Sequence, residues 1–203
     1  MKILFAALAI YLAAVTLAPV AAEAHHHDGS QAEIAGPPNG TVLIVRHAEK
    51  PDNGVGLAPA GQERAAAYAS YFGRFVIGGA PVHIDTLVAT ADSDDSDRPR
   101  LTLTPLSQAL GLPIQQPYAD KDVKGLAAWL SSQTDHVVLV AWHHGKLPKL
   151  LADLGADPGQ LLPNGVWPED VYNWVIELRY DAQGHLISAD RVVEPADLVR
   201  SRN

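Results

Sequence analysis

The sequence predicts an α/β fold with a mainly parallel central sheet and an antiparallel hairpin near its C-terminal end. Two short, continuous apolar runs at 41–45 and 137–141 are rich in β-branched residues, as is typical of strands buried on both faces of a parallel sheet. Segments with helical spacing alternate with the strand candidates, which is the order found around a parallel sheet. The turn signal Asp181-Ala-Gln-Gly184 joins the last two strand candidates and predicts the hairpin.

Each expected element is placed by its periodicity and by the residues at its ends. The first helix has Pro59 near its start and Gly73 just after its end, and the second is closed by Gly111 and Pro113. The expected strands span 41–45, 84–90, 137–141, 171–180 and 185–193, and the expected helices span 58–72, 98–110, 123–131 and 148–154. A length of 203 residues indicates one globular domain, or one domain with a short targeting segment, and the sequence contains no internal repeat.

Composition excludes several classes of site. The 203-residue chain contains no cysteine, which excludes disulfides, thiolate zinc sites, cysteine nucleophiles and a cysteine-linked lipid anchor. Its formal net charge of -8 repels nucleic-acid backbones on average, so nucleic acid is not an expected partner. Net charge does not exclude a local anion site, because a few arginines in one cleft are enough to attract an oxyanion.

The first two dozen residues have the pattern of a secretory signal. Lys2 precedes an almost wholly apolar stretch over 3–20, and Ala22-Glu23-Ala24 matches the small-x-small cleavage pattern. We therefore expect a signal peptide over 1–24 and an exported protein, periplasmic or secreted, with no stable membrane contact after cleavage. The alternative is an uncleaved membrane anchor.

The expected mature chain begins with a short linker. Residues 25–40 are rich in Gly, Pro and Ala, and we expect them to lead into a catalytic domain over 41–203. The linker opens with His25-His26-His27, which is either a metal-capturing segment or a solvated tail.

Basic side chains follow three of the expected strands. Arg46 and His47 come directly after the first strand, Arg98 follows the second by a short loop, and His143 follows the third. Ligands of open α/β sheets bind beyond the carboxyl ends of the strands, so these side chains are expected at one rim. Two guanidinium groups match the geometry of phosphate, and a histidine held in the right tautomer can attack phosphorus. Any one of these residues alone would be read as part of an ordinary loop.

The same residues resemble a known family. The segment Val45-Arg46-His47-Ala48-Glu49-Lys50 resembles the Arg-His-Gly/Ala-Glu signature of the histidine phosphatase (phosphoglycerate mutase-like) superfamily. Residues 56–61 are similar to its Leu-Thr-x-x-Gly segment, with Ala58 in place of the Thr. Arg98-Pro-Arg-Leu-Thr102 resembles its Arg-x-x-x-Thr helix, and 138–143 resembles the strand that ends in its second catalytic histidine. The likeness covers residues 41–160 or so, and the ordered set is more specific than any one motif.

The resemblance implies a fold and a chemistry. The fold is a three-layer α/β/α sandwich, and the activity is hydrolysis of a phosphomonoester, a small phosphorylated substrate. His47 would be the nucleophile that forms a phosphohistidine, while Arg46, Arg98 and a protonated His143 would hold the phosphoryl oxygens. No metal and no other cofactor is implied. His143 is preferred to His144 because it lies at the strand end, five residues before Pro148.

Several assignments are open at this point. The leaving-group acid is expected between the second and third helices, where Asp120 and Asp122 are the candidates and Asp120 is preferred. Lys50, His144 and Lys146 are expected at the rim of the pocket, where Lys50 and His144 would contact substrate. The acidic loop 92–97 departs from the family pattern. It either is a solvated loop that caps the following helix, or it repels highly anionic substrates or recruits a cationic one.

Three functions compete. The first is an exported phosphatase, for which phosphorylated lipopolysaccharide sugars are a substrate class by analogy. The second is a phosphate-binding module of the same fold without turnover, and the third is an exported metal-binding protein that uses His25–His27. The sequence gives neither the natural substrate nor the oligomeric state.

Overall fold

The two apolar runs of the sequence form neighbouring parallel strands. Strand β1 (Thr41–Arg46) pairs with β6 (Val137–Trp142) along its whole length, with Arg46 opposite Trp142. Every residue of both strands after the first is buried, as expected for strands that are covered on both faces. The computed structural model describes residues 36–199, and all structural statements refer to that part of the chain.

The central sheet is mainly parallel. Its strand order is β5-β4-β6-β1-β7-β8, and the added strands are β4 (Thr86–Ala89), β5 (Ile114–Gln115), β7 (Trp174–Tyr180) and β8 (Leu186–Val193). Strands β5, β4, β6 and β1 pair in parallel, whereas β7 runs antiparallel to both β1 and β8. The predicted fold class, a parallel sheet with a terminal antiparallel hairpin, is confirmed.

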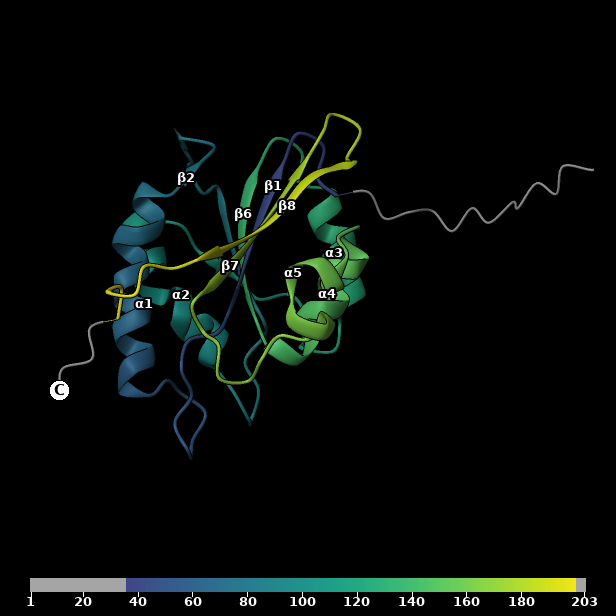
Figure 1. The fold of residues 1–203 in the computed structure, drawn as a ribbon. Coiled ribbons are helices and arrows are strands. Elements are labelled where there is room, and N and C mark those ends of the chain that lie inside the picture. The colour runs from purple at the N-terminus through teal and green to yellow at the C-terminus, as the bar shows by residue number, and fades with distance from the viewer. Residues whose placement is uncertain (1–35, 200–203) are drawn as a thin grey trace, which may run out of the picture. The chain divides into compact units, whose positions relative to one another are not determined.

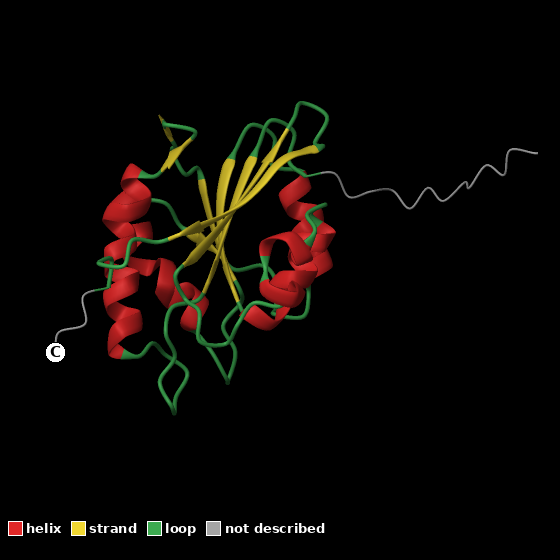
Figure 2. Ribbon diagram, viewed as in Figure 1, coloured by secondary structure: helices red, strands yellow, loops and turns green. Residues whose placement is uncertain are grey.

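Helices cover both faces of this sheet (Figures 1 and 2). One face carries α1 (Pro59–Tyr71) and α2 (Arg98–Leu110), and the other carries α3 (Val123–Ser131), α4 (Leu147–Asp153) and α5 (Pro158–Leu161). The remaining elements are the short helices η1 (Phe72–Arg74), η2 (His144–Lys146) and η3 (Pro163–Gly165) and a small ribbon of β2 (Val76–Ile77) and β3 (Ala80–Pro81). The arrangement is the expected three-layer sandwich.

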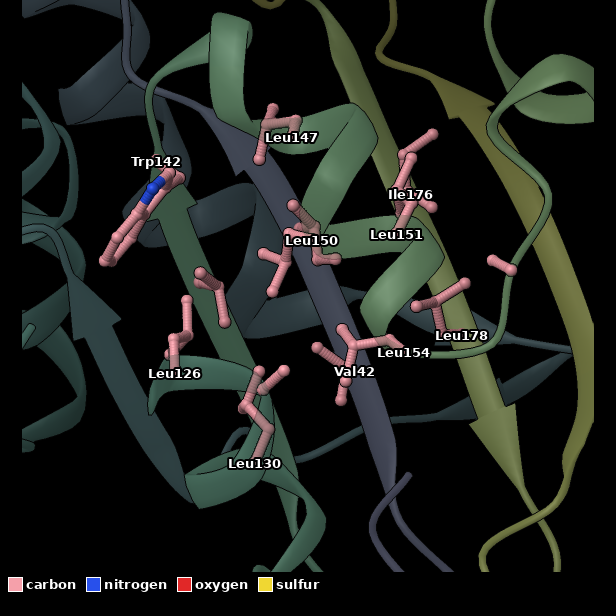
Figure 3. Close-up of a cluster of buried hydrophobic side chains, with 14 of the residues drawn as sticks. Val42, Leu126, Leu130, Trp142, Leu147, Leu150, Leu151, Leu154, Ile176 and Leu178 are labelled. Carbon is pink, nitrogen blue, oxygen red and sulfur yellow. The ribbon is translucent and has the colours of Figure 1, made fainter. Parts of the chain in front are cut away.

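Alternation along β1 divides the core between the two faces of the sheet. Val42 and Ile44 belong to a buried cluster with side chains of α3 and α4, which Figure 3 shows in close-up. Leu43 and Val45 belong to a second buried cluster with side chains of α1 and α2. Each such fully buried aliphatic side chain contributes about 1.5–3 kcal/mol to folding. The strand that carries Arg46 and His47 is therefore fixed from both sides.

The structure shortens two expected strands by more than one residue. The strand expected over 84–90 spans only Thr86–Ala89. The strand expected over 171–180 begins only at Trp174. The backbone carbonyl of Val171 accepts hydrogen bonds from Trp167 Nε1 (2.9 Å) and Arg46 Nη1 (3.2 Å), so this carbonyl is engaged by side chains instead of by a strand ladder. Residues 171–173 are part of a loop that reaches the sheet from α5.

The chain before β1 also contacts the sheet. The Gly36 amide donates to the Gly184 carbonyl (2.9 Å) and the Asn39 amide to the Asp181 carbonyl (2.8 Å), so residues 36–40 pack against the hairpin turn. The expected signal peptide and His25–His27 lie outside the described residues. Within 36–199, no helix has the length and hydropathy needed to cross a membrane.

Candidate functional site

The loops that follow the parallel strands line one cavity of about 570 Å³. It lies beyond the carboxyl ends of β1, β4 and β6, where open α/β sheets bind their ligands. The lining side chains include every site residue predicted from the sequence, namely Arg46, His47, Lys50, Arg98, Asp120, His143, His144 and Lys146. The rest of the lining consists of Ser93, Asp95, Ser96, Ala119, Lys121 and Gly145.

His47 is held at the floor of this cavity in one tautomer. Its side chain is only 3% exposed, and its backbone amide donates to the Trp142 carbonyl (2.9 Å), which extends the β1–β6 pairing by one residue. Its Nδ1 lies 2.8 Å from the backbone carbonyl oxygen of Ala48. A carbonyl can only accept, so Nδ1 carries the hydrogen and Nε2 has a free lone pair whenever the ring is neutral.

Burial keeps the ring of His47 neutral. Burial, reinforced by the nearby His143, Arg46 and Arg98, lowers the pKa of His47 to about 3, against the opposing effect of the Ala48 carbonyl. The lone pair on Nε2 is therefore available at neutral pH, which is the state that a nucleophilic imidazole requires.

His143 faces His47 across the cavity floor. The two ring centroids are 5.0 Å apart, with an edge-on angle of 66°. Burial lowers the pKa of His143, and the Asp120 carboxylate opposes this shift. The resemblance implied a protonated His143, but the direction of the shift favours a neutral ring in the free protein. A phosphoryl dianion would oppose the shift in the same way as Asp120, because negative charge stabilises imidazolium.

The guanidinium of Arg46 is held by hydrogen bonds to the loop that precedes β7. Its Nη1 donates to the carbonyls of Pro168 (3.2 Å), Glu169 and Val171 (3.2 Å), and its Nη2 donates to Tyr172 Oη (3.2 Å). The Arg46 Cζ atom also lies 3.9 Å from the centre of the Tyr172 ring. The buried Nε has no hydrogen-bond partner among residues 36–199.

Arg98 is held in a similar way from a different loop. Its Nη1 donates to the carbonyls of Gly54 (3.1 Å) and Val55 (3.2 Å), and its Nη2 donates to the carbonyl of Asp95 (3.2 Å). Its Nε is buried and also has no partner within the described part of the chain. Both arginines thus have anchored terminal nitrogens and an unpaired Nε–H. Because an unpaired buried donor costs about 1–3 kcal/mol, an acceptor oxygen from a ligand would stabilise this arrangement.

Thr102 connects the loop after β1 with the start of α2. Its Oγ1 accepts from the Ala48 amide (2.8 Å) and donates to the Arg98 carbonyl (2.8 Å). One fully buried hydroxyl therefore fixes the residue after His47 relative to the first turn of α2. The sequence singled out Thr102 only as part of a motif, and this bridging role became visible with the structure.

The structure separates the two candidate acids. Asp120 lines the cavity, and its buried Oδ1 has no hydrogen-bond partner among residues 36–199. Asp122 is instead the N-cap of α3 and accepts from the Gly125 amide (3.0 Å). Asp122 therefore has a structural role, while Asp120 is placed beside His143.

The rim carries the remaining predicted residues. Lys50, His144 and Lys146 all line the cavity, and His144 Nε2 lies 3.8 Å from Glu169 Oε1. Burial lowers the pKa of His144, and the positive charges of Arg46 and Lys50 act in the same direction, whereas Glu169 opposes them. His144 is therefore also expected to be neutral at pH 7.

Two of the four aspartates in the acidic loop before α2 are paired with an arginine. Arg100 contacts Asp92 (2.7 Å) and Asp97 (3.5 Å), and among the four aspartates of the loop only Asp95 lines the cavity. Asp97 occupies the N-cap position without a side-chain capping bond, and Ser96 Oγ accepts from the Arg98 amide (3.3 Å) instead. Capping is therefore only a minor role of this loop.

Sequence reasoning missed Tyr172 and Lys121. Neither follows a predicted strand end or belongs to a recognised motif, so no spacing signal pointed to them.

Within residues 36–199 there is no group of three or more His, Asp or Glu side chains arranged to hold a metal ion.

Comparison with known proteins identifies the fold. No family profile matches the sequence, and no curated protein sequence matches it. A solved structure, the protein histidine phosphatase SixA complexed with tungstate, superposes with a TM-score of 0.53 at 20% identity and covers 75% of this chain and 96% of its own. A putative phosphohistidine phosphatase SixA from Agrobacterium tumefaciens gives 0.49 at 18% identity, covering 76% and 98%. A phosphoglycerate mutase from Plasmodium falciparum gives 0.48 at 12% identity, covering 81% and 94%. The chain has the histidine phosphatase fold.

Proposed function

We propose that the protein is a metal-independent phosphatase that hydrolyses a phosphomonoester through a phosphohistidine on His47. The observation that carries this proposal is the state of His47, which is buried, fixed by Ala48 in the tautomer with a free Nε2, and surrounded by two anchored arginines. Such a ring is prepared to attack phosphorus without a metal or a separate base. The fold shared with a protein histidine phosphatase supports it.

In the first half of the reaction, Nε2 of His47 attacks the phosphorus atom. A P–N bond forms, the P–O bond to the leaving group breaks, and Asp120, once it has taken up a proton from solvent, gives that proton to the leaving oxygen. Nδ1–H remains hydrogen-bonded to the Ala48 carbonyl, which stabilises the positive charge on the phosphorylated ring. The Nε–H groups of Arg46 and Arg98 would hold two of the phosphoryl oxygens.

In the second half, water releases the phosphate. The Asp120 carboxylate accepts a proton from the water as its oxygen attacks phosphorus, and the P–N bond breaks. His47 recovers its lone pair, Asp120 is protonated again, and inorganic phosphate leaves. The two arginines serve both halves because the phosphoryl group carries the same charge in each.

A turnover assay with p-nitrophenyl phosphate, in the presence and absence of a chelator, tests this function. We expect steady release of phosphate that the chelator does not reduce. Stoichiometric phosphate binding without turnover would support a binding module instead, and loss of activity in chelator would contradict metal independence. The metal-binding alternative through His25–His27 lies outside the described residues and is tested by the same chelator comparison.

We also propose that the protein is exported. The support is the apolar stretch over 3–20 followed by Ala22-Glu23-Ala24. An exported phosphatase would act on phosphate groups outside the cytoplasm, such as those of cell-surface glycolipids.

A further inference from the structure

The cavity is strongly cationic although the chain as a whole carries a net charge of -8. Two carboxylates, Asp95 and Asp120, line it together with five side chains that are positive at neutral pH: Arg46, Lys50, Arg98, Lys121 and Lys146. The histidines add no positive charge to the free cavity, because burial lowers the pKa of His47, His143 and His144. Positive charge is thus concentrated where the ligand binds.

The three lysines reach the cavity from three separate loops. Lys50 follows β1, Lys121 precedes α3, and Lys146 lies in η2 after β6. None of them forms an ion pair within residues 36–199, whereas Lys149 on α4 is paired with Asp153 at 2.7 Å. The acidic loop offsets the charge of the lysines only in part, because Arg100 pairs with Asp92 and Asp97 and only Asp95 of this loop lines the cavity.

The charge exceeds what one phosphoryl group requires. The proposed reaction uses Arg46 and Arg98 for the transferred phosphoryl group, which is a dianion in most esters at neutral pH. The carboxylates of Asp95 and Asp120 offset only part of the charge of the three lysines, so positive charge is left over, and the cavity of about 570 Å³ has the size of a site for a whole small molecule. A ligand with only one anionic group would leave this part of the lining without a partner.

We propose that the cavity contains a second anion subsite, formed by Lys50, Lys121 and Lys146, and that the substrate carries a second phosphate or carboxylate besides the phosphoryl group that is transferred. This inference rests on the proposed function for the identity of the first subsite. The ligand class is a phosphomonoester with another anionic group a few bonds away.

Calorimetric titration with two non-hydrolysable ligands tests the subsite independently of turnover. The pair is propylphosphonate and 1,3-propylenediphosphonate, which differ only in the second anionic group. We expect the wild-type protein to bind the diphosphonate about three- to tenfold more tightly, the range expected for partly exposed ion pairs. The ratio should shrink as salt is raised, because exposed charges are screened.

A charge-matched pair of variants locates the effect. In Lys50→Gln/Lys121→Gln/Lys146→Gln the ratio of the two affinities should fall toward one. The control Arg74→Gln/Lys124→Gln/Lys149→Gln removes the same charge from exposed residues that do not line the cavity, and it should keep the wild-type ratio. Circular dichroism and thermal unfolding verify that both variants are folded.

Three results would overturn the subsite: equal binding of both ligands by the wild-type protein, a ratio that survives in the lysine variant, or a ratio lost equally in the control. Failure of the proposed function gives a different result, because p-nitrophenyl phosphate would then not be hydrolysed although the diphosphonate preference is intact. Hydrolysis of p-nitrophenyl phosphate by a protein that binds both phosphonates equally would support the proposed function and contradict the second subsite.

Discussion

The Nδ1 nitrogen of His47 lies 2.8 Å from the backbone carbonyl oxygen of the next residue, Ala48. This contact fixes the tautomer within a single dipeptide, so the orientation of the His47 ring depends on the main chain rather than on a partner side chain. The Ala48 amide in turn donates to Thr102, whose hydroxyl donates to the Arg98 carbonyl. His47 and the first turn of α2 are therefore linked through hydrogen bonds.

The neutral state of His47 has a consequence for stability in acid. Its pKa is about 3 in the folded protein and near 6.5 when exposed, so the unfolded state binds more protons between these values. The contribution of neutral His47 to the free energy of unfolding is fully present above pH 6.5, and it is lost as the pH is lowered toward 3. At pH 5 the His47 contribution to this loss is about 2 kcal/mol. We expect His47→Gln to lose less stability than wild type between pH 7.5 and pH 5 in urea unfolding, and the exposed control His83→Gln to resemble wild type. Equal losses of unfolding free energy in wild type, His47→Gln and His83→Gln would contradict the lowered pKa of His47.

Tyr172 is expected to position Arg46. Its ring lies 3.9 Å from the guanidinium carbon and its hydroxyl accepts from Nη2, so it acts through Arg46. Tyr172→Phe retains the ring contact and should lower kcat/KM by about two- to fivefold, whereas Tyr172→Leu removes both contacts and should lower it by about ten- to thirtyfold. The affinity for orthovanadate should fall in parallel, because the oxyanion uses the same arginine. Equal effects of the two substitutions would show that stacking on Arg46 has no role.

Asp120 is expected to matter most for poor leaving groups. Asp120→Asn should slow hydrolysis of an alkyl phosphate by about 10²–10⁴-fold and that of p-nitrophenyl phosphate far less, because nitrophenolate leaves without a proton. The control is Asp122→Asn, which alters the α3 cap but not the cavity. Comparison of kcat for the two substrates measures the difference. A uniform loss for both substrates would exclude Asp120 as the proton donor.

Thr102 is expected to support both stability and activity. Thr102→Val leaves the Ala48 amide without an acceptor, which should cost about 1–3 kcal/mol in the free energy of unfolding and loosen the loop that carries His47. Thr104→Val is the matched control, because Thr104 donates to the Arg100 carbonyl in the same way (2.9 Å) but has no bond to the His47 loop. Chemical denaturation and kcat measure the two effects. If Thr102→Val and Thr104→Val had the same free energy of unfolding and the same kcat, the bridging role of Thr102 would be contradicted.

Those parts of the fold with strong local signals were predictable from the sequence. The helices Arg98–Leu110 and Val123–Ser131 have the predicted boundaries, because glycine, proline and capping residues mark their ends. The two-residue strands β2, β3 and β5 are too short to show any periodicity and were not predicted. The boundary at 171 was wrong because an apolar residue followed by an aromatic one has strand-like composition, whereas the Arg46 and Trp167 bonds to Val171 form only in the folded chain.

The same distinction applies to the site. Arg46 is the last residue of β1, and His47 and His143 directly follow β1 and β6, so the sheet brings the three together once its topology is known. Tyr172 and Lys121 come from loops whose path depends on tertiary packing. Neither residue type nor sequence spacing predicts their position at the site. The charge compensation of the acidic loop by Arg100 is likewise a tertiary result, although Arg100 is a near neighbour in sequence.

Trapping of the phosphorylated enzyme tests the central claim most directly. Wild-type protein is mixed with ³²P-labelled phenyl phosphate, quenched within milliseconds in alkali, and mapped by peptide sequencing and mass spectrometry. We predict label on His47 that is stable in base and lost in acid, as expected for a P–N bond, formed at a rate at least equal to kcat, and absent in His47→Gln. Label on a serine or an aspartate, or undiminished turnover in His47→Gln, would contradict the account.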